Sequence, residues 1–104
     1  MREEAHNQPA WRQEMAQKLS SLRPLLSMGG DNVNLFFDDF VREYEWGLAL
    51  HVVCDYLLEP KTQAAPTAVI QQIEALHEAM GIVDSCTADL RRKAGQAGGA
   101  GGAP

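Results

Sequence analysis

The segment that most constrains the fold is EWGLALHVVCDYLL, at residues 45–58. Wound as a helix, it carries two neighbouring apolar stripes, formed by Trp46, Ala49, Leu50, Val53 and Leu57 and by Leu48, Val52 and Tyr56. A helix that is apolar around most of its circumference lies in the middle of a bundle, because every apolar side needs a neighbour to cover it. The sequence therefore predicts a central helix here, with other helices packed around it.

Apolar residues recur at spacings of three and four elsewhere in the chain, which is the signature of amphipathic helices. Together with the central segment they predict four main helices near residues 9–27, 34–43, 45–58 and 67–80. Pro24 kinks the first of these or converts it to a short turn, and Gly81 caps the last. Apolar residues after position 83 leave room for a fifth, short helix. No period-two alternation appears, so the predicted class is all-α: a small single-domain bundle.

The chain divides near residue 93. Residues 1–93 form the predicted helical domain. Residues 94–104 read AGQAGGAGGAP and offer no large apolar side chain to bury, which predicts a disordered Gly/Ala tail. The polar opening residues predict no secretory signal, and no apolar run approaches the roughly 18 residues of a membrane span.

The two cysteines, Cys54 and Cys86, both occupy apolar helical positions without CxxC spacing. Such cysteines are typical of buried, reduced thiols, and reduced thiols are typical of the cytoplasm. The sequence therefore predicts two free thiols and a cytoplasmic protein.

Negative charge is concentrated in the middle of the chain. Residues 31–59 carry seven carboxylates against Arg42 alone, which gives this third a net charge of −6 in a chain whose total is −5. The carboxylates are Asp31, Asp38, Asp39, Glu43, Glu45, Asp55 and Glu59. Such a patch disfavours nucleic acid and membrane surfaces and favours a basic protein partner. The alternative is that these charges only solvate one face of the bundle.

One group of residues resembles a chemical site. His51, Cys54 and Asp55 are spaced so that they fall on neighbouring turns of one helix. A structural zinc needs four ligands, however, and His77 would have to supply the last from another helix. A nucleophilic cysteine needs an electropositive setting, whereas Cys54 lies in the acidic third. With no phosphate-binding loop and no HExxH motif present, we predict no catalytic residues, no metal and no cofactor, and hence a protein that is not an enzyme.

Residues 42–59, RxYEWGLALHVVCDYLLE, resemble the central signature of small bacterial immunity proteins of the Maf type, whose string is approximately GEWGLALELLCDxLYE. Downstream, IEALHEAMGI at 73–82 resembles the closing helix of that family, which reads IxxLxxxMGL. The likeness covers roughly residues 15–83. Two positions depart from the family pattern: Tyr44 replaces a glycine, and His51 replaces a glutamate.

This resemblance implies an antidote that binds and neutralises a toxin domain delivered by a neighbouring cell, within a polymorphic toxin system. Many such toxins are nucleases, whose basic substrate grooves an acidic protein can occupy. The candidate partner-binding residues are Asp38, Asp39, Glu43 and Glu59, with Tyr44 as an anchor, and Glu45 and Asp55, which as signature residues could instead brace the helix junction. The alternative function is a general helical adaptor or regulatory subunit without a toxin partner.

Overall fold

The computed structural model describes the backbone of residues 9–102 and the side chains of residues 10–96. Over this range the chain forms five α-helices and one short 3-10 helix, with no β-strand, so the predicted all-α class is confirmed. The elements in chain order are α2 (Pro9–Ser20), the 3-10 helix η1 (Arg23–Leu26), α3 (Gly30–Arg42), α4 (Trp46–Leu58), α5 (Thr67–Met80) and α6 (Cys86–Gly102).

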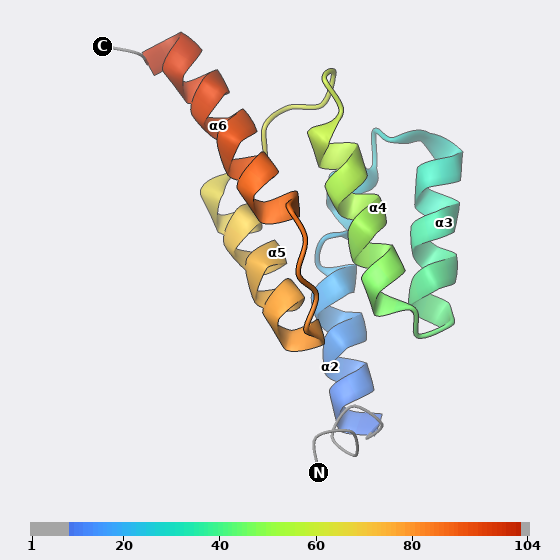
Figure 1. Ribbon diagram of the computed structural model, residues 1–104. Helices are drawn as coiled ribbons and strands as arrows, with labels where there is room; N and C mark the ends of the chain where they lie inside the picture. Colours follow the sequence, from blue (N-terminus) through green and yellow to red (C-terminus); the bar gives the residue numbers. More distant parts are fainter. Residues whose placement is uncertain (1–8, 103–104) are drawn as a thin grey trace.

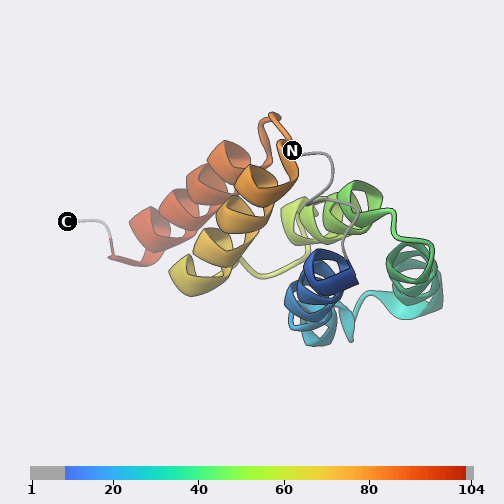
Figure 2. The same cartoon turned by 90° about the horizontal axis from the view of Figure 1, so that it is seen from below.

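Helix α4 is the centre of the bundle, as predicted. It contacts α2, η1, α3, α5 and α6, and Figures 1 and 2 show α3 on one side of it and the α5–α6 hairpin on the other. Its first apolar stripe is buried throughout. The surrounding elements contribute the rest of one continuous core, chiefly Met15, Leu19, Leu22, Leu26, Phe37, Ile70, Ile73, Leu76 and Leu90.

The predicted helix boundaries hold except at the end of the first helix, where α2 stops at Ser20 and η1 follows, and at the start of α3. Pro24 lies in the first turn of η1, where the missing N–H costs nothing, so the predicted short turn is confirmed. Gly81 ends α5 with a φ of 71°, the left-handed conformation expected of a glycine cap. Helix α3 begins at Gly30 and not near residue 34, because the Asn34 side chain lies inside the helix and donates hydrogen bonds to the carbonyls of Leu26 and Gly30.

Helix α6 is longer than the predicted fifth helix. It continues to Gly102, so residues 94–102 are helical where the sequence predicts a disordered tail. Cys86 and Leu90 anchor its first turns in the core, and a nucleated helix adds one hydrogen bond for each further residue. The first eight residues, which carry the prediction of no secretory signal, and the last two residues of the predicted tail lie outside the described residues.

The prediction of two reduced thiols is wrong in this structure. Cys54 and Cys86 are buried as expected, but they form a disulfide that joins α4 to α6, with Cα atoms 6.1 Å apart. A separation of 32 residues gives no sign of this pairing in the sequence; the α5–α6 hairpin creates it by folding Cys86 back onto α4. Because disulfides persist in oxidising compartments, the cytoplasmic prediction loses the thiol argument on which it rested.

No helix among the described residues is long and apolar enough to cross a membrane.

Replacing Leu50 by alanine should lower the free energy of unfolding by about 2–5 kcal/mol, because Leu50 is fully buried at the centre of α4. Chemical denaturation measures this loss. The matched control is Leu35→Ala on the exposed side of α3, which should change stability by no more than about 0.5 kcal/mol. Equal effects at the two positions would mean that α4 is not the centre of the core.

Replacing both cysteines by alanine should lower the free energy of unfolding by about 3–4 kcal/mol, the value expected when a loop of this length is no longer closed in the unfolded chain. Urea denaturation in metal-free buffer gives the number, and wild-type protein treated with a reductant should lose a similar amount. A reductant that leaves the wild-type midpoint unchanged would contradict the cross-link.

Candidate partner-binding surface

The turn between α3 and α4 holds an unusual backbone conformation. Tyr44 has a φ of 61°, which costs a residue with a Cβ about 1–2 kcal/mol. Two ring contacts offset this cost: the Tyr44 ring packs 5.5 Å from the ring of Trp46, and the Arg12 guanidinium lies 4.9 Å above it. Such contacts are each worth about 0.5–1.5 kcal/mol. Tyr44 therefore stays 59% exposed yet held in place, as an interface anchor requires.

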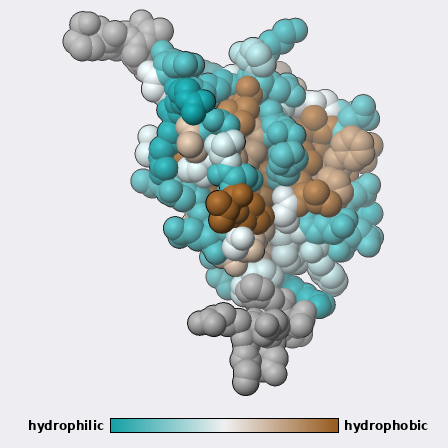
Figure 3. Space-filling view, in the orientation of Figure 1, coloured by the Kyte–Doolittle hydropathy of each residue, from teal (hydrophilic) through white to brown (hydrophobic). Residues whose placement is uncertain are grey.

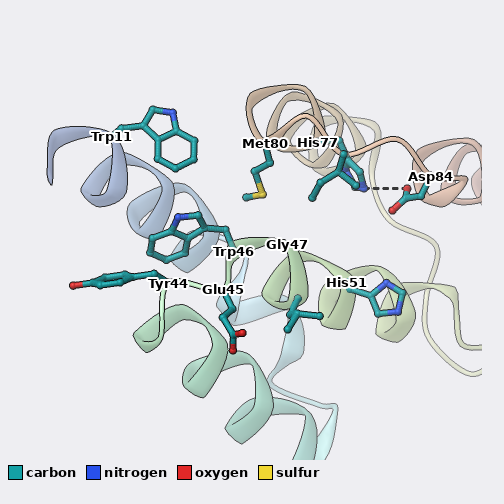
Figure 4. Close-up of a pocket in the computed structure, with 11 residues that line it drawn as sticks. Trp11, Tyr44, Glu45, Trp46, Gly47, His51, His77, Met80 and Asp84 are labelled. Carbon is teal, nitrogen blue, oxygen red and sulfur yellow. Dashed lines mark ion pairs between the residues drawn. The ribbon is translucent and has the colours of Figure 1, made fainter. Parts of the chain in front are cut away.

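A pocket of about 680 Å³ opens beside this turn. Figure 4 shows aromatic rings from α2, the turn and α4 at one end, and an ion pair between His77 and Asp84 at the other. It is lined by Trp11, Tyr44, Glu45, Trp46, Gly47, Leu48, His51, His77, Met80, Ile82 and Asp84. The pocket thus combines apolar walls with a few polar groups, an arrangement common in binding sites.

Gly47 lies in the first turn of α4, where a glycine weakens a helix. A Cβ at this position would come within 3.3 Å of the Ile82 side chain. The glycine therefore lets the loop after α5 approach α4 closely.

An apolar stripe follows the exposed side of α3 and α4. Phe36 and Leu48 are 57% and 47% exposed, and Phe40 and Val52 beside them are only partly buried. The rings of Phe36 and Phe40 stack with centroids 6.5 Å apart. Figure 3 shows apolar side chains gathered over these two helices. We call this stripe, formed by Phe36, Phe40, Leu48 and Val52, the α3–α4 surface.

Three of the predicted partner-binding carboxylates are already paired within the chain. Asp38 receives two hydrogen bonds from Arg23, at 2.8 and 3.0 Å, which join α3 to η1. Asp39 pairs with Arg42 at 2.9 Å, one turn along α3. Asp55 pairs with His51 at 3.2 Å on the exposed side of α4. Asp38 therefore has a structural role in addition to any role at a surface.

The remaining predicted carboxylates, Glu43, Glu45 and Glu59, are exposed and form no ion pair with any residue in the described range 9–102. Glu43 and Glu45 flank Tyr44 in the turn, and Glu59 follows the last residue of α4. The side chain of Glu45 makes no capping hydrogen bond to α4. These three carboxylates lie at the two ends of α4, whose exposed side carries Leu48 and Val52.

The predicted group of His51, Cys54 and Asp55 does not form one site. His51 and Asp55 face outward, whereas Cys54 points into the core and is bonded to Cys86. Cys54 meets His77 instead, from α5.

Sequence reasoning missed most of the pocket. The sequence suggests His77 only as the fourth ligand of a zinc site that we do not predict, and Trp11, Met80 and Asp84 are not among the predicted site residues. The helical spacing of Trp11, His77 and Met80 places them on inner faces, and no local signal tells a packed residue from one that lines a cavity. Whether such a residue is packed or lines the pocket depends on how α2, α4 and α5 pack against one another.

Two bidentate ion pairs shift the ionisation of their carboxyl groups. Hydrogen bonds from Arg23 lower the pKa of Asp38, and hydrogen bonds from Arg91 lower the pKa of Glu74. The first pair ties α3 to η1 and the second ties α5 to α6, so both brace neighbouring elements.

Replacing Asp38 by asparagine should remove part of the acid sensitivity of the fold. Because the pKa of Asp38 is lowered in the folded protein, the carboxylate of Asp38 in the unfolded chain is protonated first as the pH falls. The free energy of unfolding therefore rises with pH in this range. The stabilisation is fully present above the unfolded value of about 3.9 and is lost as pH falls through the lower folded value. The unfolding free energies of wild type and Asp38→Asn should therefore converge as pH is lowered.

Urea denaturation across a pH series measures this convergence. Arg23→Gln removes the same pair from the other side and should reproduce the behaviour of Asp38→Asn. A constant difference between wild type and both variants, down to the lowest pH at which the protein folds, would contradict the assignment.

No protein-family model, no curated protein and no solved structure matches this chain. The likeness of residues 42–59 to an immunity-protein signature therefore stays a prediction.

Proposed function

We propose that this protein is an antidote that binds a bacterial toxin domain through the α3–α4 surface and the carboxylates around it. The observation that carries the proposal is the exposed apolar stripe beside carboxylates that have no partner in the described part of the chain. Apolar side chains exposed together on two packed helices mark an interaction site more often than they mark chance. The toxin domain would present an apolar contact surrounded by lysine and arginine.

The apolar and the charged residues of this surface would have different roles in binding. The side chains of Phe36, Leu48 and Tyr44 are exposed, and a partner would bury them. Burial of such side chains supplies most of the binding energy at interfaces. Glu43, Glu45 and Glu59 lie at the two ends of α4, where their charge would chiefly raise the association rate and select the partner. The basic groove of a nuclease fits both requirements.

One feature of the turn supports the likeness to immunity proteins. The family string has a glycine where this chain has Tyr44, and the φ of 61° at this position is one that glycine adopts without cost. A tyrosine here keeps the turn and adds an exposed ring. A toxin pocket that accepts this ring would distinguish the partner of this chain from partners of related antidotes.

The place of action belongs to the same proposal. A toxin domain that enters a bacterial cell meets its antidote in the cytoplasm, which is where we place this protein. Reducing conditions there hold cysteines as thiols. The cytoplasmic protein and the disulfide-bonded structure are then two redox states of one chain.

The double reversal Glu43→Lys/Glu59→Lys should slow association with the toxin domain at least tenfold and reduce the salt dependence of binding, because these charges attract the partner before contact. Stopped-flow or surface-based kinetics at several salt concentrations measures both effects. The matched control is Glu78→Lys, an exposed carboxylate on α5 away from the α3–α4 surface, which should leave both unchanged. Both variants should fold as wild type does.

Phe36→Ala should raise the dissociation rate and weaken binding at least tenfold. Cells that co-express the toxin domain with each variant should lose protection in the order in which the variants lose affinity. Unchanged affinity in both the double reversal and Phe36→Ala, with protection intact, would place the interface elsewhere. A stable complex with another protein of the same cell, without protection against any toxin domain, would favour the adaptor function instead.

A further inference from the structure

Three buried side chains with metal-ligand chemistry meet where α4, α5 and α6 converge. Cys54 of α4, His77 of α5 and Cys86 of α6 place their donor atoms within 4.8 Å of one another. All three residues are buried. Cys54 is buried on α4, away from Leu48 and Val52, whereas His77 lines the same pocket as Tyr44, Glu45 and Leu48 of the proposed toxin contact.

His77 is oriented as a metal ligand would be. Its Nδ1–H donates a hydrogen bond to the Ile73 carbonyl, one turn earlier in α5, at 2.8 Å. The other ring nitrogen, Nε2, forms the ion pair with a carboxylate oxygen of Asp84 at 3.1 Å, and a metal bound at Nε2 would replace this contact. A ring whose other N–H is held by a backbone carbonyl is the usual support of a ligating histidine.

Asp84 lies beside this cluster of three donors and is the candidate for a fourth. It lies in the loop between α5 and α6, and the same carboxylate oxygen that faces His77 accepts the backbone N–H of Cys86 at 3.0 Å. Its side chain is 41% exposed and, with His77, lines the pocket beside the α3–α4 turn. The pocket therefore opens His77 and Asp84 to solvent (Figure 4), whereas neither cysteine lines it.

We propose that reduction of the Cys54–Cys86 disulfide converts this cluster into a Zn²⁺ site with Cys54, Cys86, His77 and Asp84 as ligands. A dithiol reductant donates two electrons and two protons, the S–S bond breaks, and the dithiol becomes a disulfide. Zn²⁺ then binds the two sulfurs as thiolates, and their two protons pass to solvent. The two states exclude each other because both use the same pair of sulfur atoms.

The donor set fits zinc better than a harder cation. Two thiolates and an imidazole suit a borderline-soft ion in tetrahedral geometry, and a carboxylate commonly supplies a fourth ligand. Once unbonded, the sulfurs would separate to about 3.8 Å, the spacing given by two Zn–S bonds of about 2.3 Å at a tetrahedral angle. The ion would also join α5 to α4 and α6, whereas the disulfide joins α4 and α6 alone.

The test is metal binding by the full chain in its two redox states. Protein reduced with a water-soluble phosphine, and oxidised protein, are each titrated with Zn²⁺ against a chromophoric chelator and with Co²⁺ alone. The reduced protein should bind one equivalent of Zn²⁺, and its Co²⁺ form should show thiolate-to-cobalt charge transfer and tetrahedral d–d bands. The oxidised protein should bind at least a hundredfold more weakly.

Three variants test the ligands, and a fourth serves as the control. Cys54→Ser should abolish tight binding, His77→Gln should weaken it at least tenfold, and Asp84→Asn should weaken it about tenfold while circular dichroism stays unchanged. The matched control is His51→Asn, which removes the exposed histidine beside Asp55 and should bind Zn²⁺ as wild type does.

A reduced wild-type protein that remains helical but binds no Zn²⁺ would overturn the proposal and leave a purely structural disulfide. Equal binding in both redox states would also overturn it. Since Cys54→Ser removes a core residue, Asp84→Asn keeps the test decisive if that variant fails to fold: unchanged affinity and Co²⁺ spectrum in Asp84→Asn would exclude the four-ligand site.

Discussion

The structure depends on the burial of one helix. Because α4 is apolar around most of its circumference, it is stable only where other elements cover it, and α2, η1, α3, α5 and α6 each cover one sector. The sector that stays open carries Leu48 and Val52 and continues onto Phe36 and Phe40 of α3. The α3–α4 surface therefore combines the side of the central helix that the bundle leaves uncovered with the neighbouring side of α3.

The entry into α4 connects this surface to the rest of the bundle. Tyr44 turns the chain through a left-handed conformation, and its ring is held by Trp46 from α4 and Arg12 from α2. Two elements that are distant in sequence thus stabilise one strained turn. Packing offsets the strain of that turn and holds the exposed aromatic ring in a fixed position. A ring that is already fixed loses little conformational entropy on binding, which favours association.

The opposite side of α4 has a different character. There Cys54 meets Cys86 and His77, and the link to α6 is covalent in the oxidised protein. The two proposals therefore rest on different chemistry, although His77 and Asp84 line the same pocket as Tyr44 and Glu45. Both depend on the compartment: the proposed cytoplasmic antidote would keep its cysteines reduced, and only the reduced cluster has metal-ligand chemistry.

The sequence by itself determined the helices, the central place of α4 and its buried stripe, because helical periodicity and proline or glycine stops are local properties of the chain. It also located the negative charge. It did not determine that Asp38 pairs with Arg23, that Cys54 pairs with Cys86, or that His77 and not His51 lies beside the sulfur atoms. Each of these contacts joins residues on different elements, and only the packing angles of whole helices bring such residues together. Nor did composition predict that α6 continues to Gly102, since a helix anchored at one end by buried residues propagates through a segment that would not start one.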